Sequence, residues 1–167
     1  MSTLVIAPTT STLLGSTADV KVTDTRRVLL AAVPASGSYR VEAFIPSMGQ
    51  ENHAANMVEL ASGDLLCTWF AGSREGAGDI KVAVARLPKG AAQWSPPARV
   101  SEDSARSEQN PILFAAPNGD IWLLYTAQET RGCPRDEWDR RVAAGEAEGG
   151  YTMQWTAQIR RRVSRDN

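Results

Sequence analysis

The residue types that could do chemistry gather in two short stretches of the sequence. GQENHAAN (49–56) contains His53, the single histidine of the chain, and GSREGAGD (72–79) contains Arg74 and Asp79. An imidazole can act as a general base near neutral pH, and a carboxyl group can act as a general acid or base. Each has a plain structural reading: a hydrogen-bonded histidine at the start of a strand, a solvated loop arginine, and an aspartate that caps a glycine-rich turn.

Other kinds of chemistry fit the sequence poorly. The stretch GSREGAG is rich enough in glycine for a phosphate loop, but such a loop needs a helix behind it, and DIKVAVAR (79–86) alternates as a strand. Cys67 and Cys133 belong to no CxxC motif and have one histidine to join them, which argues against a zinc site or a disulfide framework. We therefore predict no metal and no cofactor, and we expect Cys67 to be a small core residue.

The bulk properties are those of a globular protein. The chain has 167 residues, of which 43% are hydrophobic and 22% charged, and its net charge of -1 offers no basic field for nucleic acid. No apolar run approaches the roughly 20 residues that span a bilayer, and the N-terminus lacks the pattern of a signal peptide. We expect a cytoplasmic protein without a nucleic-acid or membrane partner.

The elements that must position these residues are short strands. Residues 1–38 are expected to form an irregular arm or one added strand, with VLLAAV (28–33) as the candidate. From Tyr39 onward, short apolar runs alternate with Gly, Pro, Asn and Asp, which is typical of antiparallel strands. ELASGDLLCTWFAG, with its Gly63-Asp64 turn, is echoed 56 residues later by FAAPNGDIWLLYTAQ. Each copy reads as a hairpin.

A third strand is expected after each hairpin, which gives an all-β fold of repeated four-stranded antiparallel meanders. These strands are DIKVAVAR in the first repeat and YTMQWTAQIRRRV (151–163) in the second, where a charged insert at 128–150 delays it. We predict a surface loop or a short helix for the insert. The size and pattern are those of propeller blades, one at about 50–100 and one at about 108–167.

The segments HAANMVELASGDLLCTWFAGSREGAGDIKVAVAR, QWSPPARV and SEQNPILFAAPNGDIWLLYT resemble the sialidase (neuraminidase) superfamily with BNR or Asp-box repeats. The resemblance covers residues 39–167, and the closing SRDN matches the first half of an Asp box, Ser-x-Asp-x-Gly-x-Thr-Trp. It implies a partial β-propeller, about two blades of a six-bladed propeller. We therefore expect an N-terminal fragment that releases no product from a fluorogenic sialoside on its own.

The resemblance also implies roles for four residues. Asp79 matches the acid/base of the family, Arg74 matches the second of three arginines that bind the substrate carboxylate, and Asn110 matches an Asn-Pro where a substrate group is contacted. His53 stands where the first arginine is expected, a departure from the family pattern. The Asn110-Pro111 pair is also a common turn at the start of a strand.

The functional hypothesis is a sialidase-like glycoside hydrolase, an exo-glycosidase that acts on sialic acid or another acidic glycan. Two alternatives remain open: a non-catalytic propeller that binds carbohydrate or protein, and a uronate-acting polysaccharide lyase with His53 as general base. Bare blade edges predict self-association. Four of the five tryptophans, Trp155 among them, are expected to pack between sheets, and Trp138 in the insert is expected to be exposed.

Overall fold

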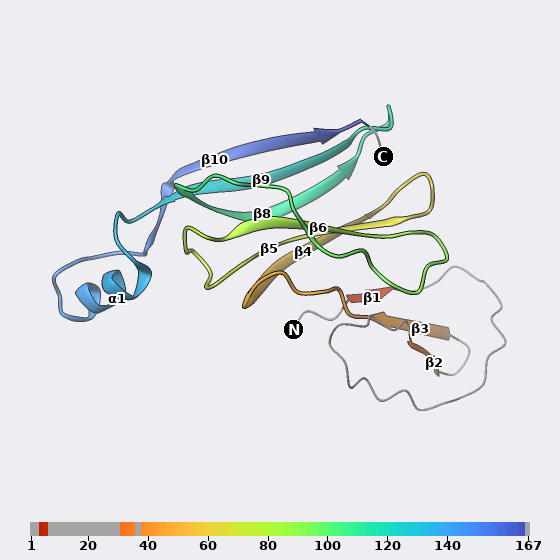
Figure 1. Cartoon of the computed structure of the whole chain (residues 1–167), viewed down its shortest axis with the longest axis horizontal. Coiled ribbons are helices and arrows are strands. Elements are labelled where there is room, and N and C mark those ends of the chain that lie inside the picture. Colours follow the sequence, from red (N-terminus) through yellow and green to blue (C-terminus); the bar gives the residue numbers. More distant parts are fainter. Residues whose placement is uncertain (1–3, 7–30, 36–37, 166–167) are drawn as a thin grey trace.

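The computed structural model describes residues 4–6, 31–35 and 38–165, and most of that part of the chain lies in two facing antiparallel sheets (Figure 1). The first sheet has the order β4-β5-β6-β7, formed by Glu51–Glu59, Leu65–Gly72, Lys81–Leu87 and Ala98–Arg99. The second has the order β10-β9-β8, with β8 at Arg106–Ala115, β9 at Ile121–Thr130 and β10 at Thr152–Ser164. Both are meanders in chain order, so the expected all-β fold and partial propeller are confirmed.

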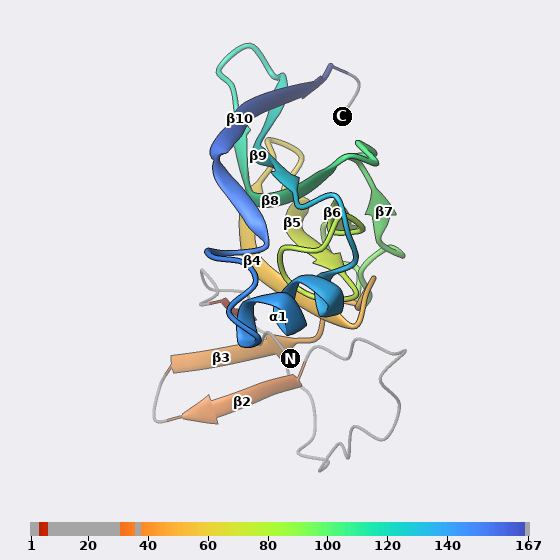
Figure 2. The same cartoon turned by 90° about the vertical axis from the view of Figure 1, so that its left-hand side faces the viewer.

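A third, small sheet is formed before the first blade. Its strands are β1 (Leu4–Ile6), β2 (Ala31–Ala35) and β3 (Ser38–Ala43), in the order β1-β3-β2. It lies on the side of the β4–β7 sheet away from β8–β10 (Figure 2). Most of the arm expected over residues 1–38 falls outside the described residues, as do 28–30 of the expected strand and the final Asp166 and Asn167.

The two hairpins repeat each other in atomic detail. In the first, the N–H of Leu60 donates to the carbonyl of Asp64 at 2.8 Å, and in the second the N–H of Ala116 donates to the carbonyl of Asp120 at 2.8 Å. The third turn residue has a φ of 84° at Gly63 and 90° at Gly119. Such a φ favours glycine because it has no Cβ to clash, which explains why Gly-Asp marks both copies.

The repeat extends to an irregularity that the sequence pattern hides. The register of β4 shifts between His53 and Asn56, and that of β8 shifts between Gln109 and Ile112. Each shift inserts one extra residue opposite its partner strand, a β-bulge, and Ala54 and Asn110 both take a φ of 53° there. The two bulges are 56 residues apart, the same offset as the two turns. Each bulge re-aims the residue before it.

The core lies in two layers. Between the facing sheets pack Leu60, Val82, Leu113, Ile121, Leu123 and Tyr125. On the other face of the first sheet pack Cys67, Trp69, Ala71, Ala83, Ala85, Leu87 and Trp94, against Ile45 and Met48. Cys67 is fully buried, as predicted, and burial raises the pKa of its thiol to about 11.

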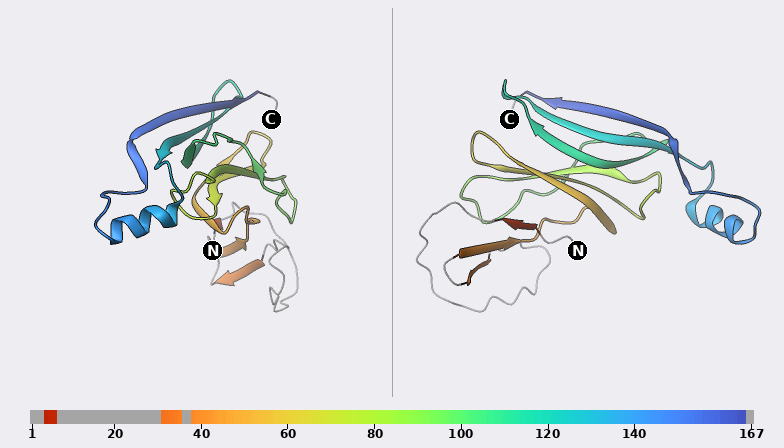
Figure 3. Two further views of the ribbon diagram at one scale, coloured as in Figure 1. Left: turned by 60° about the vertical axis from the view of Figure 1, so that its left-hand side comes forward. Right: turned by 180° about the vertical axis from the view of Figure 1, so that it is seen from behind.

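The insert contains the helix α1 (Arg135–Ala143), which stands at the end of the molecule where β10 begins (Figure 3). The prediction that Trp138 is exposed is wrong: it is 8% exposed, whereas Trp155 is 74% exposed. The helix folds back on its own loop, so that the guanidinium of Arg131 lies 4.4 Å from the Trp138 ring and 5.3 Å from the Trp155 ring. The Trp138 indole N–H also donates to the Gly149 carbonyl at 3.2 Å.

Candidate functional site

The two bulged strands and the insert meet around one cleft of about 450 Å³. The first sheet supplies the start of β4 and the glycine-rich turn between β5 and β6, and the second supplies the middle of β8, the end of β9 and the start of β10. The lining residues are Glu51, His53, Arg74, Glu75, Gly76, Gln109, Gln128, Arg135, Gly150, Tyr151, Thr152 and Gln154. Of the four residues predicted for the site, His53 and Arg74 line this cleft.

His53 stands between two carboxylates at the edge of the cleft. Its Nδ1 lies 3.4 Å from Glu75 Oε2, and its Nε2 lies 3.9 Å from Glu51 Oε2. The ring also packs against Phe70, with the ring centroids 5.4 Å apart. The backbone N–H of Glu75 donates to the Glu51 carboxylate, which ties the glycine-rich turn to β4. An imidazole held in this way is oriented for proton exchange while its side chain is still 44% exposed.

Asp79 closes the glycine-rich turn rather than lining the cleft. One of its oxygens accepts the Ser73 N–H at 2.9 Å, and the other accepts the Ser73 hydroxyl at 2.9 Å. The side chain is on the surface, so it is open to solvent although both oxygens have a partner. This is the capping contact that the sequence allowed for. The acid/base role of Asp79 stays a prediction.

Arg74 is drawn toward the insert by an ion pair. Its Nη1 lies 2.9 Å from Asp139 Oδ2, and the Nε of Arg135 lies 3.0 Å from Asp139 Oδ1. Arg135 Nη1 also donates to the Glu75 carbonyl at 3.0 Å. Two guanidinium groups that line the cleft therefore converge on one carboxylate. The sequence signal was an Arg and an Asp one helical turn apart in the insert, a pattern that is usually a solvated surface pair.

Gln109, and not its neighbour Asn110, faces the cleft. Asn110 is the bulged residue of β8 and is exposed, while Gln109 is 6% exposed and accepts a hydrogen bond from Gln128 Nε2 at 2.6 Å. Burial alternates from Gln109 to Phe114, and the bulge shifts the register of β8 with β9 within this stretch. The 56-residue offset that aligns His53 with Gln109 was the signal that could have found it.

A buried charge pair lies behind the cleft and joins the two sheets. Lys81 is 4% exposed and donates to the carbonyls of Gly78, Ile80 and Arg106 at 2.6, 2.9 and 3.0 Å. Its Nζ lies 3.8 Å from Glu108 Oε2, and Glu108 is fully buried. Burial lowers the pKa of Lys81, and the Glu108 charge opposes that shift. Because Lys81 bonds to both the glycine-rich turn and β8, it fixes the two walls of the cleft relative to each other.

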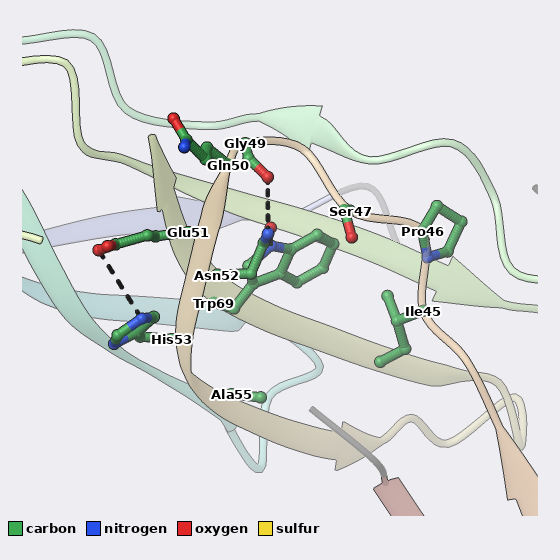
Figure 4. Close-up of a pocket in the computed structure, with 10 residues that line it drawn as sticks. All are labelled: Ile45, Pro46, Ser47, Gly49, Gln50, Glu51, Asn52, His53, Ala55 and Trp69. Carbon is green, nitrogen blue, oxygen red and sulfur yellow. Dashed lines mark hydrogen bonds and ion pairs between the residues drawn. The ribbon is translucent and has the colours of Figure 1, made fainter. Parts of the chain in front are cut away.

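A second hollow of about 460 Å³ lies on the other side of Glu51 and His53 (Figure 4). One of its two amide residues, Asn52, is already engaged: Oδ1 accepts the Trp69 indole N–H at 3.0 Å and the Met48 N–H at 3.1 Å. The Asn52 amide also donates to the Gly49 carbonyl at 2.8 Å. These bonds hold the loop before β4 in place, so we assign this hollow a structural role.

Within the part of the chain that the structure describes, no three His, Cys, Asp or Glu side chains are grouped so that they could hold a metal ion. Among the same residues, no helix has the length and apolar character needed to cross a membrane.

Two meanders whose strand ends meet at one cleft define a segment of a β-propeller. A family model described as "BNR repeat-like domain" matches residues 63–166, more than half of the chain, so the chain belongs to the BNR repeat-like family. Among solved structures it is similar to "Hadza microbial sialidase Hz136", with a TM-score of 0.50 and 18% identity over 71% of this chain. The chain covers 24% of that sialidase, and at this identity the likeness concerns the fold. No curated protein matches the chain.

Proposed function

We propose that the chain contributes one side of the active site of a sialidase-like glycoside hydrolase that acts on a terminal acidic sugar. The observation that carries the proposal is the cleft itself, where His53 of β4 and Arg74 of the turn between β5 and β6 are brought together. The sialidase fold likeness supports the reaction class. A guanidinium at this position offers a fork for the sugar carboxylate.

In this proposal Arg74 orients the carboxylate, His53 positions the sugar ring, and Asp79 is the acid/base. Asp79 closes the turn that presents Arg74, so a substrate seated on Arg74 lies close to the turn. Ser73 gives both Asp79 oxygens a donor, and the surface position of the side chain leaves it room to reach a ligand. Asn110 is proposed as a contact for a neutral group of the glycan from the outer side of the bulge.

The test measures hydrolysis of a fluorogenic sialoside by the natural full-length protein, with Asp79→Asn and Asp64→Asn as a matched pair. Asp64 lies in the hairpin turn of β4 and β5 and does not line the cleft, and its side chain accepts the Lys89 N–H, so it controls for the loss of a turn aspartate. We expect Asp79→Asn to lower kcat by about 100-fold or more, in the range of general acid–base catalysis, and Asp64→Asn to leave kcat near wild type. Equal activity of the two variants would refute the role of Asp79.

One observation favours a second candidate, a uronate-acting lyase. His53 lies in the cleft with carboxylates at 3.4 and 3.9 Å, while Asp79 does not line it. In that reaction His53 is the general base that removes the proton at C5, next to the uronate carboxylate, while the glycosidic C4–O bond breaks, a C4–C5 double bond forms and the leaving oxygen takes up a proton. His53→Ala then abolishes formation of the unsaturated product, which is followed by its ultraviolet absorbance, and Asp79→Asn does not. Ligand binding without turnover of either substrate would favour a non-catalytic carbohydrate-binding propeller.

A further inference from the structure

The ion pairs of Asp139 differ from an ordinary surface ion pair because they join two separate segments of the chain. Asp139 belongs to α1, and its two oxygens face arginines from two different segments, Arg74 of the glycine-rich turn and Arg135 of the helix. The distances are 2.9 Å from Arg74 Nη1 and 3.0 and 3.2 Å from Arg135 Nε. Both arginines line the cleft. A carboxylate held between two guanidinium groups is the contact that an acidic ligand would make there.

Arg135 is held in place by contacts that do not involve Asp139. Its Nη1 donates to the Glu75 carbonyl at 3.0 Å, and its guanidinium lies 5.4 Å from the centroid of the Tyr151 ring. Gly76, with a φ of 81°, allows this approach, because a Cβ at that position would lie 3.2 Å from Arg135 Nη1. The Arg135 side chain is 26% exposed. Removing Asp139 therefore leaves the Arg135 fork aimed at the same point.

The Asp139 side chain is partly open to solvent. It is 38% exposed and belongs to a nine-residue helix, one turn after Arg135. Displacement by a ligand requires a change of the Asp139 rotamer that turns its carboxylate to water, which then hydrates the charge. Arg74, at 52% exposure, is free to follow an incoming ligand. Exchanging one carboxylate for another at this point conserves the charge balance of the site.

We propose that Arg74 and Arg135 form a two-arginine binding site for a ligand carboxylate, and that Asp139 occupies this site as an internal competitor until a ligand displaces it. The proposal rests on the proposed function in one respect, that the natural ligand is an acidic sugar. It adds Arg135 as a binding residue and assigns the insert a regulatory role, because the insert supplies both the second arginine and the group that blocks it.

The test compares Asp139→Asn with Asp136→Asn. Asp136 lies on the same helix, is exposed, and its carboxylate has no hydrogen bond or ion pair among the described residues, so the two variants share the charge change and differ in the arginine contacts. Binding of N-acetylneuraminic acid, glucuronic acid and acetate is followed by the NMR shift of the Arg135 Nε–H. We expect Asp139→Asn to bind carboxylates about two- to fivefold more tightly than Asp136→Asn, since an exposed ion pair competes by that amount. Arg74→Ala in the Asp139→Asn background should remove the gain.

The outcomes separate this inference from the proposed function. If Asp139→Asn binds every carboxylate no more tightly than Asp136→Asn, Asp139 is a structural ion pair and the inference is wrong, whatever the sugars do. If acetate binds more tightly to Asp139→Asn than to Asp136→Asn but neither sugar acid binds to any variant, the two-arginine site is supported and the acidic-sugar function is wrong. Thermal unfolding of both variants shows that each is folded, and a wild-type-like melting temperature is required before the affinities are compared.

Discussion

The buried Lys81 offers the sharpest test of how the cleft is held together. Lys81→Met keeps most of the apolar stem and removes the ammonium group, which donates to three carbonyls and lies 3.8 Å from the Glu108 carboxylate. After the change, Glu108 remains fully buried with Arg160 Nη1 at 3.6 Å and the Asp103 N–H at 3.1 Å as partners. One charge of a buried pair is then only partly compensated.

The expected cost follows from that geometry. Breaking a buried ion pair by removing one partner typically costs about 3–5 kcal/mol. The Arg160 contact retains part of the compensation, so we expect the lower end, about 3 kcal/mol in the free energy of unfolding, or roughly 150-fold in the unfolding equilibrium. Glu108→Gln in the Lys81→Met background should recover about 1 kcal/mol or more, because it removes the uncompensated charge.

The assay is urea unfolding followed by tryptophan fluorescence and circular dichroism, with Lys89→Met as the control. Lys89 is exposed and its side chain donates no hydrogen bond among the described contacts, so its loss should cost less than about 0.5 kcal/mol. A Lys81→Met cost below about 1 kcal/mol, or costs that simply add in the double variant, would refute the claim that this pair joins the two walls of the cleft.

Three further outcomes are expected. The hydrogen bond from the Lys89 N–H, and after it a nearby arginine, lowers the pKa of Asp64 in the folded protein. The ionised Asp64 therefore stabilises the fold above its unfolded pKa of about 4, and this stabilisation is lost as the pH falls below that value. Asp64→Asn should make the melting temperature depend less on pH across that range. Gly76→Ala places a Cβ 2.6 Å from a threonine hydroxyl of β10 at a φ of 81°, and should cost about 1–3 kcal/mol in urea unfolding, whereas no loss would contradict the close approach. In native protein near neutral pH, a thiol reagent should modify Cys133 and spare Cys67, because Cys67 is buried and its pKa is raised to about 11. Rapid labelling of both cysteines would contradict the burial of Cys67 in the core.

The sequence predicted the fold well because its signals are local. Gly63-Asp64 and Gly119-Asp120 mark turns that need a positive φ, and the alternation in 81–87 marks a strand, which is buried along one face and partly buried along the other. The insert was harder, since the exposure of Trp138 depends on where a helix lies after it folds back. Trp138 is covered by contacts within the insert region, a cation–π contact with Arg131 before the helix and a hydrogen bond to the Gly149 carbonyl after it.

The candidate site shows why side-chain direction was harder to predict than strand position. Burial alternates without a break from Gln109 to Phe114, although the register of β8 with β9 shifts within that stretch. A bulge leaves almost no trace in hydrophobic periodicity, because it adds a single residue whose effect is a change of face. Only the comparison of the two repeats carries the information: Ala54 and Asn110 share a φ of 53° at the same offset.

That shared bulge suggests how the two repeats build one cleft. In each repeat the first strand bends at the same position, and the residue before the bend, His53 or Gln109, turns toward the same space. The hairpin turns at the opposite ends of the strands carry the repeat motif and fix register, while the bulged ends are free to differ. A histidine in one repeat and a glutamine in the other therefore occupy equivalent backbone positions with different chemistry. The backbone can therefore repeat while the chemistry of the site differs between the repeats. The backbone conformation determines where each side chain points, and the residue type determines which chemistry it offers at that place.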